Sequence, residues 1–152
     1  MAEEIVWTYA SQVVLEGTGA SIAVNGFQAA DLSELTWRSD IHSNYPWADF
    51  ALRIDFQAAV DGNSFINLYR QDVEIDGDND APAPAATYTY KFVGSFPIIS
   101  GVGGASSPNY YSLTDIPIKY AQQFWIENKA SQAVDHSWSL KATPKTYMPA
   151  PK

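Results

Sequence analysis

Apolar and polar residues alternate with a period of two along much of this chain, which is typical of β-strands that bury one face. The clearest segment is residues 50–57, where Phe50, Leu52, Ile54 and Phe56 fall on one face and polar side chains on the other. This segment predicts a strand whose apolar face contributes to a core.

The same alternation predicts strands at residues 64–70, 88–92, 116–120, 124–127 and 138–142, and weaker ones around 13–15, 22–24 and 35–38. Residues 28–35 can instead form a short helical turn. Asp61-Gly62-Asn63 predicts a hairpin turn between the first two strong strands, because Gly and Asn adopt positive φ at low cost.

About eight to ten short strands, some joined by long connections, indicate an all-β fold. The predicted architecture is a single antiparallel β-sandwich domain of the jelly-roll or Greek-key type over residues 1–152. Pro117 suggests an edge strand or a bulge. The prolines after residue 142 predict that residues 143–152 leave the sheet as an extended tail, and residues 1–12 are expected to form an N-terminal arm.

Composition narrows the expected partners. Charged residues make up only 17% of the chain, against about 25% in typical soluble domains, which suits a protein that works in an assembly. The formal net charge of −8 argues against binding to nucleic acid or to anionic membranes. Glu3 and Glu4 stand where a signal peptide carries basic residues, so synthesis in a cytosol is expected.

Asp76, Asp78 and Asp80 place carboxylates at alternate positions, as calcium-binding loops do. An EF-hand loop that began at Asp76 would need Gly at its sixth position and Glu at its twelfth, where this chain has Ala81 and Thr87. The EF-hand interpretation is therefore excluded. A looser calcium site remains a weak alternative to a solvated acidic turn.

No motif for catalysis or for a cofactor is present in the sequence. Cysteine is absent, and the two histidines, His42 and His136, belong to no triad or zinc motif. A pair of carboxylates for glycoside hydrolysis remains open, but no pair is singled out. We therefore expect a non-enzymatic protein without catalytic residues or cofactors.

Aromatic residues make up 14% of the chain, and most fall on the inward phase of predicted strands. The binding candidates lie off that phase or in loops, and they are Tyr45, Trp47, Tyr110, Tyr111 and Trp125. Exposed rings of this kind stack on sugars or anchor protein contacts. The competing interpretation is that Pro46 and Trp47 pack a loop onto the end of the sandwich.

Short segments along the chain resemble a group of small structural proteins of tailed bacteriophages. They are residues 45–49 (YPWAD), 67–69 (NLY), 75–78 (IDGD), 93–96 (VGSF), 113–117 (LTDIP) and 124–131 (FWIENKAS). The resemblance spans roughly residues 36–143, and its motifs are short and structural.

This resemblance implies a virion structural protein, foremost a capsid decoration (cement) protein made in the host cytoplasm. Its expected partner is the major capsid protein, and a homotrimer is the favoured form of self-association. Buried aromatic anchors and added strand pairing would then supply the binding energy. The alternative is a carbohydrate- or receptor-binding sandwich of a phage tail or fibre.

Overall fold

The computed structural model describes residues 5–30, 45–73, 80–103, 108–118 and 122–149. Within these ranges all regular structure is β-strand. The strands are β1 (Ile5–Tyr9), β2 (Val13–Gly19), β3 (Phe27–Ala29), β4 (Trp47–Ile54), β5 (Phe65–Asp72), β6 (Phe92–Pro97), β7 (Asn109–Pro117), β8 (Gln122–Asn128) and β9 (Trp138–Pro149).

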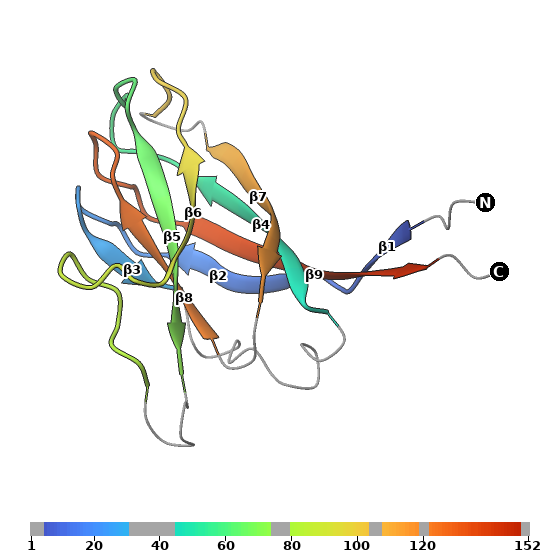
Figure 1. Ribbon diagram of the computed structural model, residues 1–152. Helices are drawn as coiled ribbons and strands as arrows, with labels where there is room; N and C mark the ends of the chain where they lie inside the picture. Colours follow the sequence, from blue (N-terminus) through green and yellow to red (C-terminus); the bar gives the residue numbers. More distant parts are fainter. Residues whose placement is uncertain (1–4, 31–44, 74–79, 104–107, 119–121, 150–152) are drawn as a thin grey trace.

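The strands form two antiparallel sheets that pack face to face (Figure 1). The larger sheet has the order β1-β9-β4-β7, with β2 also paired to β9, and the smaller sheet has the order β3-β8-β5-β6. From β2 onward the partners are nested: β2 with β9, β3 with β8, β4 with β7 and β5 with β6. This nesting is the jelly-roll topology, and it confirms the predicted fold class.

The core lies between the sheets and follows the alternation seen in the sequence. Phe50, Leu52 and Ile54 of β4 are buried, while Ala51 between them is exposed. Phe50 packs against Phe124 of the opposite sheet, with ring centroids 4.8 Å apart. The prediction for residues 50–57 is therefore confirmed in its essential feature, a strand with one buried face.

β9 is longer and more central than the prolines suggested. It continues through Pro144 to Pro149, with β4 on one side and β2 and then β1 on the other. The backbone N–H of Ala10 donates to the carbonyl oxygen of Pro144. The N and C=O of one strand residue point to the same side of the strand. The nitrogen of Pro144, which carries no hydrogen, therefore points toward residues 10–12, and these residues form no strand. Proline removes at most the return bond to Ala10, which lies outside the strands, so β9 continues through Pro144 and the predicted departure of this segment from the sheet is wrong.

β1 and the last residues of β9 form a two-stranded ribbon. The register runs from Tyr9 opposite Lys145 to Ile5 opposite Pro149. Figure 1 shows this ribbon projecting beyond the two packed sheets. Segments 1–12 and 143–152, expected as separate arms, thus meet through their described residues.

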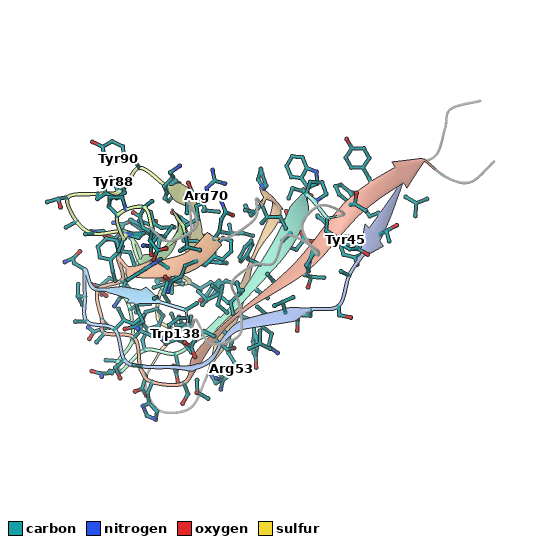
Figure 2. All side chains as sticks on the ribbon, turned by 90° about the horizontal axis from the view of Figure 1, so that it is seen from below. Tyr45, Arg53, Arg70, Tyr88, Tyr90 and Trp138 are labelled. Carbon is teal, nitrogen blue, oxygen red and sulfur yellow. The ribbon has the colours of Figure 1, made fainter. Side chains whose placement is uncertain are left out.

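Two further predictions placed structure wrongly around turns. Residues 62 and 63 do form a turn, but β4 and β5 lie in different sheets, so it is not a hairpin. Residues 88–91 are not a strand: Ala85 and Tyr88 exchange backbone hydrogen bonds, and β6 begins at Phe92. The alternation of Tyr88 and Tyr90 therefore occurs in a loop on the side of the smaller sheet (Figure 2).

Other boundaries also moved. The strand expected at residues 116–120 begins earlier, at Asn109, and ends at Pro117 on the edge strand β7, as the proline suggested. Ile22 forms only an isolated bridge to Val134. The strand at residues 35–38 and most of the helical alternative at 28–35 lie outside the described residues.

Candidate functional site

The ribbon carries an unusual concentration of exposed apolar side chains. Val6, Trp7, Tyr9 and Tyr147 keep between 41% and 54% of their surface accessible. Trp7 and Tyr147 lie opposite each other in the register and meet edge to face, with ring centroids 5.7 Å apart. Such pairs are favourable in themselves, but they leave about half of each side chain accessible to water.

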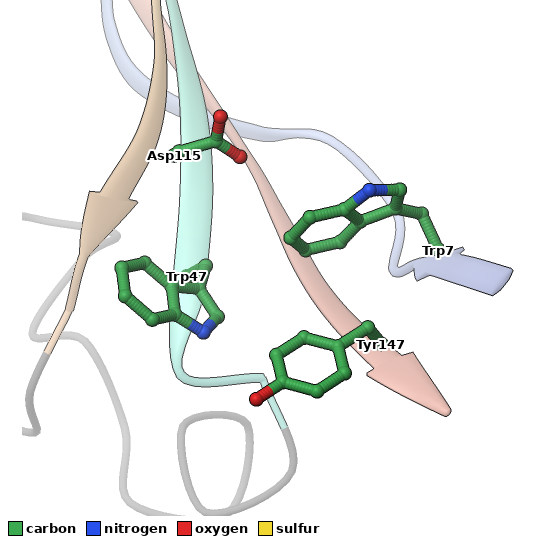
Figure 3. Close-up of a pocket in the computed structure, with 4 residues that line it drawn as sticks. All are labelled: Trp7, Trp47, Asp115 and Tyr147. Atoms are coloured by element: carbon green, nitrogen blue, oxygen red, sulfur yellow. The ribbon is translucent and has the colours of Figure 1, made fainter. Parts of the chain in front are cut away.

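Where the ribbon joins the larger sheet, aromatic side chains surround a pocket of about 520 Å³. It is lined by Trp7, Trp47, Asp115 and Tyr147, which come from four different strands (Figure 3). Trp47 is opposite Lys145 on β9 and Pro117 on β7. The register of the three strands therefore brings Trp47 beside the ribbon.

Lys145 joins the aromatic rings to two carboxylates. Its Nζ atom lies 2.6 Å from Oδ1 of Asp49 and 2.7 Å from Oδ1 of Asp115, and it is 4.4 Å from the centroid of a Trp7 ring. Only 4% of Lys145 is exposed. Burial alone would lower the pKa of this ammonium, but hydrogen bonds to Asp115 and Asp49 raise it above its ordinary value.

A β-bulge in β7 helps place the carboxylate of Asp115. The register with β4 shifts between Ala48 and Phe50, which leaves one extra residue on β7. Asp115 adopts a φ of 58°, and its backbone N–H donates to Oδ1 of Asp49 at 3.0 Å. Asp tolerates this left-handed conformation better than most residues, and bulges commonly redirect a side chain near a binding site.

The pocket offers groups that can bind a ligand or a partner. The rings offer apolar surface, and the two carboxylates against one ammonium leave one excess negative charge. The pocket therefore favours an apolar or cationic group from a ligand or partner. Among the described residues no group of three or more metal-binding side chains is found.

The aromatic candidates from the sequence do not form one surface. Trp47 lines the pocket, and the half-buried Tyr45 precedes it by two residues. Tyr110 is 73% exposed but lies at the far end of the edge pair β4–β7, opposite Arg53.

The remaining two candidates are held in the body of the protein. Tyr111 packs against the core, and its hydroxyl accepts a hydrogen bond from Ile99. Trp125 is half-buried on the smaller sheet, and its Nε1 donates to Gln71 at 2.8 Å. Neither offers a free ring face comparable with those of the ribbon.

Most of the candidates for metal binding and catalysis cannot be placed in the described part of the chain. Asp76, Asp78 and His42 lie outside the described residues, so the calcium hypothesis stays a prediction. Asp80 is described and exposed. His136 is exposed and contacts its neighbour Asp135 at 2.8 Å.

Sequence reasoning missed Trp7, Asp115, Lys145 and Tyr147. A signal existed for Trp7, because Trp7 and Tyr9 alternate with Val6 and Thr8 as in a strand. Tyr147 had none, since the prolines around it argued against a strand. The contacts of Asp115 and Lys145 depend on a bulge and on three-strand register, which the local sequence does not reveal.

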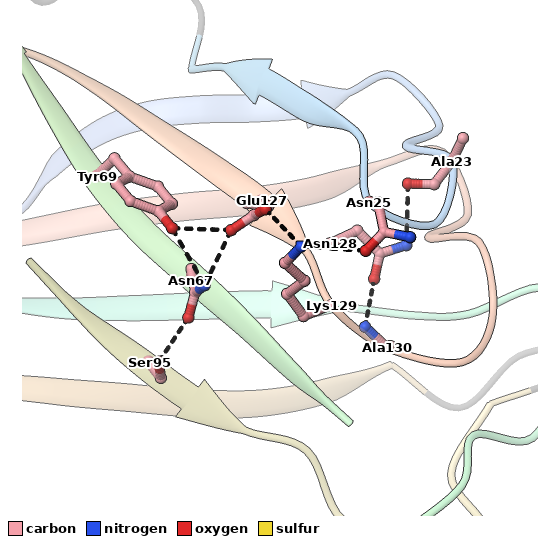
Figure 4. A network of polar contacts seen from close by, with 9 residues as sticks. All are labelled: Ala23, Asn25, Asn67, Tyr69, Ser95, Glu127, Asn128, Lys129 and Ala130. Atoms are coloured by element: carbon pink, nitrogen blue, oxygen red, sulfur yellow. Dashed lines mark hydrogen bonds and ion pairs between the residues drawn. The ribbon is translucent and has the colours of Figure 1, made fainter. Parts of the chain in front are cut away.

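A second polar cluster lies on the smaller sheet and centres on Glu127, only 2% of which is exposed (Figure 4). Its carboxylate accepts hydrogen bonds from Asn67 at 2.9 Å and Tyr69 at 2.8 Å, and it forms an ion pair with Lys129 at 2.9 Å. Ser95 completes the cluster by donating to Asn67 at 2.6 Å.

The pKa values in this cluster follow from burial and these bonds. Burial alone would raise the pKa of Glu127, but hydrogen bonds from Asn67, Lys129 and Tyr69 lower it overall. Burial and the bond to Glu127 raise the pKa of Tyr69 to about 12. Because each polar group has a partner, the cluster serves to hold β5, β6 and β8 in register.

Comparison with protein-family models and with curated proteins identifies no relative of this chain. Among the described residues, no helix has the length and apolar character to cross a membrane. The chemistry of the ribbon and its pocket is therefore what indicates a function.

Proposed function

We propose that the protein is a non-enzymatic virion structural protein, a phage capsid decoration protein that binds and stabilises the assembled coat lattice. The resemblance to small tailed-phage structural proteins supports this proposal. The jelly-roll fold is compatible with it, since viral capsid proteins use this fold, as do lectins. Fold alone does not determine function, so the proposal has to be supported by the surface of the protein.

The observation that carries the proposal is the projecting aromatic ribbon. A two-stranded ribbon without a second layer is only marginally stable in water, and this one exposes Val6, Trp7, Tyr9 and Tyr147. Trp and Tyr are the residues most often found as energetic anchors of protein interfaces. A partner that covers the ribbon would bury these rings and stabilise the ribbon at the same time.

The edge of β1 offers a second mode of attachment. In the part of the chain that is described, β1 pairs with β9 alone, so its other edge presents backbone donors and acceptors. An extended segment of a coat subunit can add to such an edge as a further strand. Binding to the assembled lattice is expected because neighbouring subunits can then contact the edge and the rings together.

Electron cryomicroscopy of the phage particle that encodes the chain tests the location. Density for a jelly roll on the outer capsid lattice, with the ribbon against coat subunits, is the expected result. Density at a tail tip instead would favour the receptor-binding alternative, and absence from the particle would overturn both. Sedimentation of the free protein tests whether it forms the homotrimer that the resemblance implies.

A binding assay with assembled coat shells tests the ribbon itself. The double variant Trp7→Ala, Tyr147→Ala should lose at least about 30-fold in affinity, because an interface anchor typically contributes 2 kcal/mol or more. Tyr90→Ala is the matched control, since Tyr90 is exposed on the side of the smaller sheet. Equal losses in both variants, or none in the ribbon variant, would contradict this use of the ribbon.

A further inference from the structure

A second hollow, of about 310 Å³, lies on the outer face of the larger sheet. It shares no lining residue with the aromatic pocket. The residues that line it include Gln12, Ala51, Arg53, Tyr110, Ser139 and Lys141. Figure 2 shows Arg53 on the side of the molecule opposite Tyr88 and Tyr90. No residue of β1 lines it, so it is independent of the ribbon.

The strand register explains why a hollow forms here. Arg53 on β4 lies opposite Ser139 on β9 and opposite Tyr110 on β7, so these three side chains form one row across the sheet. In the next row Ala51 lies opposite Lys141. Because the side chain of Ala51 is small, the surface is depressed between the longer side chains around it.

The hollow is positively charged although the chain as a whole is acidic. Arg53 is held in place because its Nη1 donates to the carbonyl oxygen of Ser137 at 2.8 Å. Neither Arg53 nor Lys141 forms an ion pair with a carboxylate among the described residues, and none of the lining residues is acidic. Glu16, on the neighbouring strand β2, accepts a hydrogen bond from the backbone of Thr18.

We propose that this hollow binds an acidic sugar, with its carboxylate on Arg53 and Lys141. A guanidinium matches the two oxygens of a carboxylate, and Lys141 adds a second positive charge. The ring of Tyr110 is 73% exposed and offers a flat face for the apolar side of a pyranose. Ser139 and Gln12 supply hydrogen-bonding groups for sugar hydroxyls.

The size of the hollow agrees with this ligand class. About 310 Å³ is at the lower end of the range for small-molecule pockets, which suits a short oligosaccharide rather than a long polymer. The net charge of −8 disfavours a polyanion with many phosphates, whereas a single carboxylate can use the two local cations. The proposal stands apart from capsid decoration and does not require it.

Calorimetric titration of the full chain tests the ligand class. The probe is trigalacturonate, and the matched control is the same trisaccharide with every carboxylate methyl-esterified. We expect the acidic probe to bind at least 10-fold more tightly than the ester. Equal affinities, or no detectable binding of either sugar, would overturn the proposal. Tighter binding of a short oligothymidylate than of trigalacturonate would also overturn it, since the ligand would then be a phosphate.

Variants test the location of the site. Tyr110→Ala and Lys141→Met should each weaken trigalacturonate binding at least 5-fold, with little change in thermal stability because both side chains are solvent-accessible. Arg53→Gln should abolish binding, and its thermal midpoint must be measured because Arg53 also bonds Ser137. Trp7→Ala should bind normally. If Tyr110→Ala and Lys141→Met both bind like the unmodified protein, the sugar site is not here.

Discussion

The Nζ atom of Lys145 lies 2.6 Å from Oδ1 of Asp49, and this contact fixes the base of the ribbon to the larger sheet. Asp49 is on the strand adjacent to β9, and the same oxygen also accepts the backbone N–H of Asp115. One carboxylate therefore ties the ammonium to the bulge of β7. The rings of the pocket are arranged around this contact, so the stability of the pocket depends on it.

Lys145→Met should lower the free energy of unfolding by about 1–3 kcal/mol. The substitution leaves the carboxylates of Asp49 and Asp115 close together without their shared cation, and breaking a buried ion pair is costly. The side chain of Asp115 is 58% exposed, so screening by solvent moves the expected loss of stability toward the lower end of this range. Urea denaturation of the variant and of the unmodified protein measures this difference in the free energy of unfolding.

The control is Lys141→Met, because Lys141 lies on the same strand and forms no ion pair with a described carboxylate. That variant should change stability by less than about 0.5 kcal/mol. Equal stability of the two variants would show that the cluster around Lys145 contributes nothing.

Gly19→Ala should be strongly destabilising. An added Cβ at Gly19 would lie 2.0 Å from Cε2 of Trp138, a fully buried side chain whose Nε1 donates to Ala20. Relieving the overlap must displace the indole, so a loss of about 2–4 kcal/mol is expected. Gly62→Ala is the matched control, since nothing lies within 4 Å of its added Cβ. Thermal midpoints that fall equally in both variants would contradict this account of the contact.

Glu127 should make stability depend on pH on the acid side. Its pKa in the folded protein is below the ordinary value of 4.5, so its contribution is complete above that value and is lost as the pH falls through the lowered pKa. Glu127→Gln should cost about 1–3 kcal/mol at pH 7 and should reduce the loss of stability between pH 5 and pH 3.

Part of that acid dependence should survive in the Glu127→Gln variant. Although burial raises the pKa of Asp72, hydrogen bonds from Lys91 and Gln122 lower it overall, so Asp72 acts in the same direction. Denaturation curves at several pH values measure both effects. An unchanged pH dependence of stability in the variant would show that the pKa of Glu127 is not lowered in the folded protein.

Tyr69 should make the protein less stable in alkali. Its pKa rises from 10.0 to about 12 on folding, so the neutral phenol stabilises the fold below pH 10 and this stabilisation is lost between pH 10 and about 12. The loss is about 1.4 kcal/mol for each pH unit in this window. Tyr69→Phe should be less stable at pH 8 but should lose less stability on titration from pH 10 to 12. Parallel stability curves for the two proteins would refute the raised pKa.

Much of the fold followed from local patterns. The alternation around Phe50, Leu52 and Ile54 was sufficient to predict a strand with one buried face, and the number of such segments indicated a sandwich. Failures occurred where the same local pattern is compatible with two environments. Tyr88 and Tyr90 alternate as strand residues do, yet Ala85 closes a turn onto Tyr88 and their rings remain in a loop.

The sequence alone determined the fold class, the buried faces of the main strands and the acidic, cysteine-free character of the chain. These properties depend on the period of the side chains and on composition, which are local or additive. Only the tertiary structure decided that β9 continues past Pro144, because its missing N–H happens to face a gap between β1 and β2. Only the tertiary structure brought Trp7, Trp47 and Tyr147 together around Lys145, because contacts between residues far apart in the sequence depend on strand order and register.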